Sequence, residues 1–197
     1  WITMEKSAHL PFWTELARKG YIIASVEYRM SSTKHFPAQL EDVKSAIRYL
    51  RAHAEEFHID PERIVAAGES AGGHLAALAG VTGDRREYDV GENLEMSSSV
   101  QAVLDFYGPA DFLSHVAEEN EEKPESEEKP EFLMGPSPVE MLLGYAPEKH
   151  PEKARLAAAL SYVNPDTPPF YIIHGTVDPI VPVEGSRNLA KKLEGYG

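Results

Sequence analysis

The segment RIVAAGESAGGHLAAL, residues 63–78, constrains the fold of this chain more than any other. Arg63 to Ala67 is short and apolar and follows an Asp-Pro pair typical of turns, so it predicts a strand. His74 to Leu78 is rich in helix formers and predicts a helix that continues to about Ala79. Ser70 therefore lies in a tight turn that joins a strand to a helix.

This turn makes Ser70 a candidate nucleophile. A serine hydroxyl reacts only when the chain presents it to a base, and a strained strand-to-helix turn does so. The strain crowds the residues two before and two after the serine, and we expect Gly68 and Gly72 to relieve it. The alternative is an ordinary serine in a glycine-rich turn, which the flanking strand and helix disfavour. We expect the neighbouring Glu69 to make a structural hydrogen bond rather than to touch substrate.

The rest of the chain alternates between predicted strands and helices. Further strands are predicted at Tyr21–Glu27, Val100–Tyr107 and Pro169–His174, and helices at His9–Lys19, Ala38 to about Phe57, Leu142–Leu143, Glu152–Leu160 and Glu184–Leu193. The longest of these helices starts after Pro37 and has apolar residues at helical spacing. This alternation predicts an α/β chain with a mostly parallel sheet covered on both faces, a three-layer α/β/α sandwich.

Composition excludes several classes of function. The 197 residues include 19 basic and 32 acidic ones, a formal net charge of −13, so nucleic acid and anionic membrane surfaces are poor partners. There is no cysteine, which rules out thiolate catalysis, disulfides and cysteine-bound zinc but leaves the compartment open. No run of eighteen apolar residues predicts a membrane span. At 42% hydrophobic residues, 1–197 is predicted to form a single domain with a substantial core.

An acidic segment interrupts the pattern at residues 118–131. It holds eight glutamates, two lysines and two prolines. Like charges repel and little of such a segment can be buried, so we expect a solvated insertion, with a lid over the site as the alternative.

Two stretches of sequence resemble the α/β-hydrolase superfamily. They are SVEYRMSSTKHFPAQLEDVKSAIRYLRAHAEEFHIDPERIVAAGESAGGHLAAL and PPFYIIHGTVDPIVPV. Within that superfamily the chain is similar to the esterase/lipase branch, near hormone-sensitive-lipase-like and acetylxylan or feruloyl esterase-like enzymes. The resemblance covers most of Tyr21 to Val183. It implies an α/β-hydrolase fold and hydrolysis of small carboxylic esters.

The resemblance also implies roles for single residues. Asp178, four residues beyond the last predicted strand, occupies the place of the triad acid, which would accept the histidine ring N–H and stabilise the imidazolium. An aspartate before proline is also a common turn residue, which is the alternative reading. The backbone N–H of Ala71, next after Ser70, would donate to the oxyanion. Trp1 resembles the tryptophan that often follows the family's histidine-glycine-glycine loop. No metal or cofactor is implied.

The triad histidine is the missing part. The resemblance implies a histidine some thirty residues after Asp178, after one more strand, and the chain ends at Gly197. We therefore expect an internal piece of a longer enzyme, with an incomplete hydrolase domain. Of the histidines present, we expect His74 to be a packing residue, His174 to brace the acid loop and His35 to border the pocket. The others, none in the expected order, are His9, His53, His58, His115 and His150.

Three hypotheses for function stay open at this stage. The leading one is a serine esterase that acts through an acyl-enzyme on Ser70, on short acyl groups carried by sugars, alcohols or phenols. A peptidase of the prolyl-oligopeptidase kind shares the fold and the turn. The third is an inactive fragment or binding module, because Ser70 stays a neutral alcohol without a base. We expect the acyl pocket to draw on loops 31–36 and 106–112, and oligomeric state is not predicted.

Overall fold

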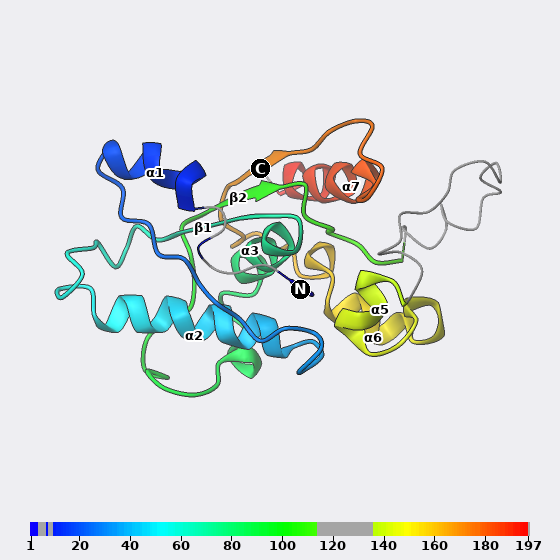
Figure 1. Ribbon diagram of the computed structural model, residues 1–197, viewed down its shortest axis with the longest axis horizontal. Helices are drawn as coiled ribbons and strands as arrows, with labels where there is room; N and C mark the ends of the chain where they lie inside the picture. Colours follow the sequence, from blue (N-terminus) through cyan, green and yellow to red (C-terminus); the bar gives the residue numbers. More distant parts are fainter. Residues whose placement is uncertain (4–6, 8–9, 114–135, 197) are drawn as a thin grey trace.

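The computed structural model describes residues 1–3, 7, 10–113 and 136–196 (Figure 1). Its strands are β1 (Val65–Glu69), β2 (Ala102–Phe106) and β3 (Phe170–Ile173). Its α-helices are α1 (Leu10–Arg18), α2 (Ala38–Ala52), α3 (Ala71–Val81), α5 (Pro138–Leu143), α6 (Pro151–Leu156) and α7 (Val183–Glu194). Short 3₁₀ turns are η1 (Arg86–Tyr88), η3 (Pro147–Lys149) and η4 (Ala159–Ser161). The acidic segment 118–131 lies outside the described residues, so its role stays a prediction.

The three strands form one parallel sheet in the order β1-β2-β3. Two of them fall within the predicted ranges, whereas β1 starts at Val65, two residues later than predicted. The delay has a local cause, because Asp60 accepts the N–H of Glu62 and its carbonyl accepts the N–H of Arg63, which extends the turn. Since the strands are parallel, their carboxyl ends meet at one edge of the sheet.

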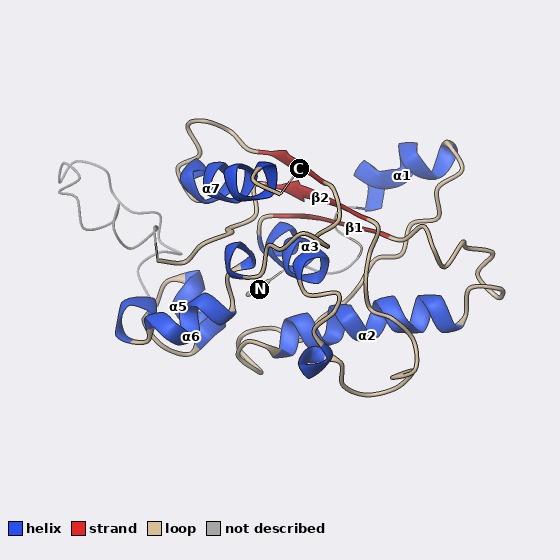
Figure 2. Ribbon diagram, turned by 180° about the vertical axis from the view of Figure 1, so that it is seen from behind, coloured by secondary structure: helices blue, strands red, loops and turns tan. Residues whose placement is uncertain are grey.

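Helices lie on both sides of this sheet, as predicted. In Figures 1 and 2, α2 and α3 lie on one side and α1 lies on the other. The contact with α3 is close at Gly80, because a β-carbon there would come within 2.4 Å of Val103 on β2. On the opposite side, the rings of Phe12 and Trp13 from α1 pack edge-on against Phe106. The layers confirm the predicted α/β class.

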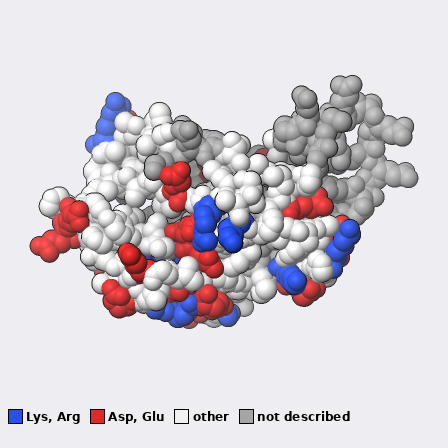
Figure 3. Space-filling model, turned by 60° about the horizontal axis from the view of Figure 1, so that its bottom comes forward, with Lys and Arg blue, Asp and Glu red and all other residues white. Residues whose placement is uncertain are grey.

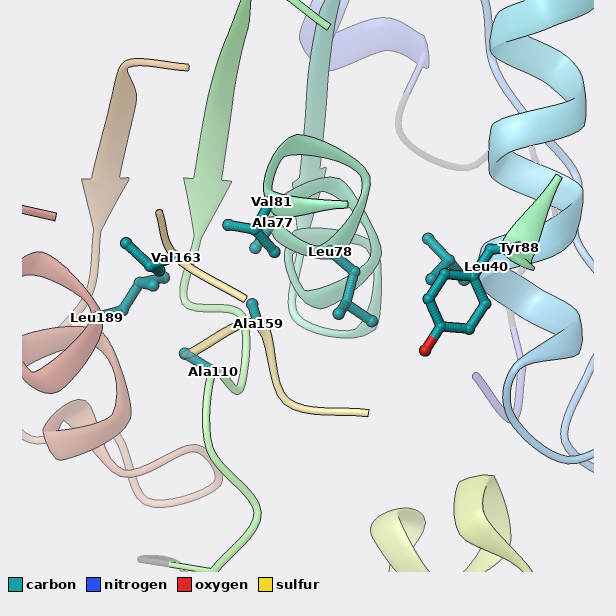
Figure 4. Packing of buried hydrophobic residues seen from close by; sticks show 9 residues of the cluster. All are labelled: Leu40, Ala77, Leu78, Val81, Tyr88, Ala110, Ala159, Val163 and Leu189. Carbon is teal, nitrogen blue, oxygen red and sulfur yellow. The ribbon is translucent and has the colours of Figure 1, made fainter. Parts of the chain in front are cut away.

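The core lies between the sheet and the helices on the α3 side (Figure 4). Figure 4 shows it reaching from Leu189 of α7, across Leu78 of α3, to Leu40 of α2. These three leucines are completely buried. Burying one such side chain is worth about 1.5–3 kcal/mol, so this cluster ties the amphipathic helices to the sheet.

The predicted strand at Tyr21–Glu27 is wrong. This segment forms no strand, and Tyr21 and Ile22 are 61% and 55% exposed. Its apolar, β-branched composition favours a strand, but a strand also needs a neighbour for its backbone hydrogen bonds. None of the described strands pairs with it.

Two predicted helices end earlier than expected. Helix α2 stops at Ala52 instead of about Phe57, because the chain turns back and Phe57 packs against Tyr49. The predicted helix 152–160 divides into α6 and η4.

Helix α5 begins with a reciprocal cap in which Ser137 Oγ accepts the Glu140 N–H and the Glu140 carboxylate accepts the Ser137 N–H.

A buried ion network holds the loop after α3 against α2. Lys44 and Arg48, both completely buried, lie 3.5 and 2.9 Å from Asp89 Oδ1. Lys44 also donates to the carbonyl oxygens of Thr82 and Arg85, at 2.6 and 2.7 Å. The face shown in Figure 3 carries acidic and basic side chains interspersed.

Candidate active site

Ser70 occupies a strained turn between the end of β1 and the start of α3. Its backbone has φ 50° and ψ −115°, in a region that non-glycine residues rarely adopt. Its N–H donates to the Phe106 carbonyl oxygen at 2.9 Å, and its carbonyl oxygen accepts the His74 N–H at 3.0 Å. The turn is therefore fixed to β2 on one side and to α3 on the other.

The glycines around Ser70 have different tasks. A β-carbon on Gly68 would lie 2.3 Å from the Gly72 carbonyl carbon, so Gly68 relieves crowding as predicted. The same prediction is wrong for Gly72, where a β-carbon would meet nothing within 4 Å. Gly73 is a glycine whose role the sequence analysis missed, because a β-carbon there would lie 2.5 Å from Asp105 Oδ1.

Ala71 is the first residue of α3. The first N–H groups of a helix have no partner within it and lie at the positive end of its dipole, which suits them to stabilise an anion.

Ala71 also packs against a buried apolar cluster, made up of Trp1, Leu75, Phe112, Leu142, Leu143, Ala154 and Ala157. Phe112 and Trp1 are core residues of this cluster, so the predicted pocket loop 106–112 contributes to the interior at its end.

Asp178 lies in the loop that follows β3, at the same edge of the sheet as Ser70. Its Oδ1 accepts the N–H groups of Ile180 and Val181, at 2.8 and 2.9 Å. This is the turn role weighed as the alternative, and it occupies one carboxylate oxygen. The other, Oδ2, lies 3.6 Å from His174 Nε2 in a side chain that is 20% exposed.

His174 braces this loop, as predicted. Its ring is 3% exposed, and Nε2 donates to the Val181 carbonyl oxygen at 2.8 Å. A carbonyl can only accept, so Nε2 carries a proton, and Nδ1 shares a hydrogen bond with Ser186 Oγ at 2.7 Å. Both ring nitrogens are thus engaged away from Ser70.

His74 is a buried packing residue, as predicted. Trp1 Nε1 can only donate, so Nδ1 of His74 accepts its hydrogen at 3.1 Å, and Nε2 donates to the Ala157 carbonyl oxygen at 2.7 Å. Burial lowers the pKa of His74 to about 4, which keeps the ring neutral. His35 lies against α5, with Nδ1 3.0 Å from the Met141 carbonyl oxygen.

No hydrogen bond joins Ser70 to His53, His58 or His150, the remaining histidines that the structure describes. His53 contacts Tyr49, and His150 contacts Tyr145. His9 and His115 lie outside the described residues.

Two acidic residues, Glu69 and Asp105, lie near Ser70, and the role of Asp105 was not predicted from the sequence. Glu69 accepts a hydrogen bond from the Tyr107 hydroxyl at 2.8 Å, the structural bond expected of it. Asp105, on β2, is completely buried, and its Oδ1 accepts the Gly108 N–H at 2.8 Å. Its Oδ2 has no hydrogen-bond partner among the described residues, and burial raises its pKa to about 6. The signal in the sequence that could have identified Asp105 was its position as a single acidic residue inside an otherwise apolar strand.

Known proteins resemble the chain along most of its length. A sequence profile of the BD-FAE family matches residues 1–193. Esterase LipC of Mycobacterium tuberculosis is 34% identical over 180 residues, which cover 91% of this chain and 42% of LipC. The chain thus spans less than half the length of this curated relative.

Solved structures share the fold. A truncated carbohydrate esterase from gut microbiota has a TM-score of 0.74 at 33% identity and covers 88% of this chain and 61% of its own. The butyrate-bound esterase Est2 of Thermogutta terrifontis has a TM-score of 0.76 at 27% identity, covering 100% of this chain and 65% of its own. A structure of Est2 phosphoramylated by tabun is also known.

Within the described residues, no helix combines the length and apolar character that crossing a membrane requires.

Proposed function

The chain belongs to the BD-FAE family of α/β-hydrolase esterases, and from this premise we propose that it is a serine hydrolase that cleaves carboxylic esters through an acyl-enzyme on Ser70. The observation that carries the proposal is the strained, positive-φ backbone of Ser70 at the strand-helix junction. Strain of this kind is retained where the surrounding structure enforces it, and it concentrates at reactive sites.

The proposed reaction has two halves. Ser70 Oγ attacks the ester carbonyl and loses its proton to a histidine base, and the Ala71 N–H stabilises the oxyanion. The alcohol then leaves with that proton, and water hydrolyses the acyl-enzyme to free the acid and Ser70. Asp178 orients the base and stabilises its charged form. We assign the base to neither His74 nor His174, because both ring nitrogens of each are engaged elsewhere.

Short acyl groups on carbohydrate or phenolic alcohols are the proposed substrates. The carbohydrate esterase among the similar structures and the butyrate bound to Est2 support this choice. Organophosphorus reagents such as tabun modify reactive serines. The tabun adduct of Est2 therefore supports a serine nucleophile in the proposed reaction. The matched region covers only 42% of LipC, so the substrate of the whole protein is proposed and not taken from that relative.

The test compares ester and amide hydrolysis by the full-length protein. Cleavage of p-nitrophenyl acetate should exceed cleavage of an aminoacyl p-nitroanilide, and Ser70→Ala should lower kcat by roughly 10³-fold or more. Asp178→Asn should lower kcat by at least about 10²-fold, with substrate affinity retained. Ser161→Ala, at an exposed serine on η4, is the matched control and should keep full activity.

Each contrary result has a distinct meaning. Faster anilide cleavage that is lost in Ser70→Ala would identify a peptidase. Ester hydrolysis that survives Ser70→Ala would remove Ser70 as the nucleophile.

A further inference from the structure

Ser70 has a strained neighbour on the adjacent strand. The β1–β2 register pairs Glu69 with Phe106, so Ser70 and Tyr107 follow side by side at the carboxyl edge of the sheet. Tyr107 has φ 46°, close to the 50° of Ser70. A bulky residue with this backbone is an outlier that persists only when its surroundings hold it there.

Tyr107 is held from three directions. Its N–H donates to the Ile173 carbonyl oxygen at 2.7 Å, and its hydroxyl donates to Glu69 Oε2 at 2.8 Å. Its ring packs edge-on against the His174 ring, with centroids 6.5 Å apart. Tyr107 therefore contacts the residue before Ser70 on one side and the residue that braces the Asp178 loop on the other.

The hydrogen bond from the Tyr107 hydroxyl to Glu69 should persist at every pH at which the enzyme is assayed. Burial, together with the charges of Glu69 and Asp178, raises the pKa of Tyr107 to about 12. The phenol thus stays protonated across the range in which ester hydrolysis is measured. A hydroxyl that donates to a carboxylate forms a charge-assisted bond, stronger than one between neutral groups.

We propose that Tyr107 is a positioning residue that fixes the Ser70 turn relative to the Asp178 loop, through its hydroxyl bond to Glu69 and its ring contact with His174. The proposal rests on the proposed function, in which Ser70 is the nucleophile. Small displacements of a nucleophile from its base reduce the rate steeply while leaving substrate binding almost unchanged. The link is therefore expected to affect kcat and not KM.

The experiment uses Tyr107→Phe in the full-length protein, which removes one oxygen and keeps the ring. We expect kcat for p-nitrophenyl acetate, counted per serine titrated by a fluorophosphonate, to fall roughly tenfold, with KM within about twofold. The second-order rate of fluorophosphonate labelling should fall in parallel. Tyr171→Phe, at a tyrosine on β3 that is 63% exposed, is the control and should match the wild type.

Glu69 tests the same bond from the other side. Glu69→Gln keeps an acceptor oxygen, so its loss in kcat should be smaller, about threefold, and Tyr107→Phe with Glu69→Gln should fall no further than Tyr107→Phe alone. Glu69→Ala removes the acceptor and replaces Tyr107→Phe as the test if that variant does not fold.

The outcomes separate this inference from the proposed function. Wild-type kcat per titrated serine in Tyr107→Phe, with a lower melting temperature, would make Tyr107 a structural residue only and overturn the inference. In that case Ser70→Ala would still be inactive and the proposed function would stand. Hydrolysis that survives Ser70→Ala would overturn both.

Discussion

A β-carbon on Gly68 would lie 2.3 Å from the carbonyl carbon of Gly72, so the backbones of these two residues are in direct contact. Real β-carbons do not approach backbone atoms this closely, and neither backbone can move without moving Ser70. The contact is one-sided, because the space beside Gly72 is open.

Gly68→Ala and Gly72→Ala should therefore differ sharply. Gly68→Ala is expected to cost about 2–3 kcal/mol in the free energy of unfolding and to abolish labelling of Ser70. Gly72→Ala adds a helix former to α3 without a clash, so its stability should equal the wild type or exceed it by up to about 1 kcal/mol. Urea unfolding of both variants checks this. Equal destabilisation by the two changes would contradict the one-sided contact.

The neutral ring of His74 predicts a loss of stability in acid. The unfolded chain protonates this histidine near pH 6.5 and the folded chain only near pH 4, where the bond from Trp1 is lost. More protons bind to the unfolded state in this window, so the free energy of unfolding falls as pH drops from 6.5 to 4, by up to about 3 kcal/mol.

His74→Phe isolates this effect. At pH 7 it should destabilise by about 2 kcal/mol or more, because the Trp1 N–H and the Ala157 carbonyl lose a buried partner. The difference from the wild type should shrink as pH falls toward 4. Urea unfolding across this range measures it, and a difference that does not change with pH would exclude a buried neutral His74.

Asp105 predicts a trend of the opposite sign. Burial raises its pKa from 3.8 to about 6, so between these values the folded state holds more protons than the unfolded state. Its contribution to stability is complete at low pH and is lost as pH rises through 6, by up to about 3 kcal/mol. Asp105→Asn cannot ionise and should gain stability relative to the wild type between pH 4 and pH 7.5. A constant difference over that range would contradict the prediction.

Asp89 is predicted to matter for stability because it neutralises two buried cations. Asp89→Ala leaves Lys44 and Arg48 buried without their carboxylate and should cost about 3–5 kcal/mol. Glu184→Ala breaks the exposed pair with Arg187 on α7 and should cost less than about 1 kcal/mol. Comparable urea midpoints for the two variants would contradict the role of the buried network.

Local features of the fold were readable from the chain. The strands β2 and β3, the turn at Ser70 and the helix after it follow from residue pattern within about ten positions. The loop that holds Asp178 was readable because an apolar strand precedes it, whereas the role of Asp178 in that loop was implied by the resemblance to α/β-hydrolases. Tyr21–Glu27 carries a similar pattern and forms no strand, because pattern specifies a backbone preference and not the presence of a neighbour.

The amino-acid sequence by itself determined that a serine would be held between a strand and a helix, because backbone geometry depends on adjacent residues. Only the tertiary structure decided which side chains surround it. Glu69 and Tyr107 are 38 positions apart, and Trp1 and His74 are 73 positions apart, yet each pair shares a hydrogen bond. Burial, ionisation and partner choice depend on atoms that folding brings together, and no local pattern contains them.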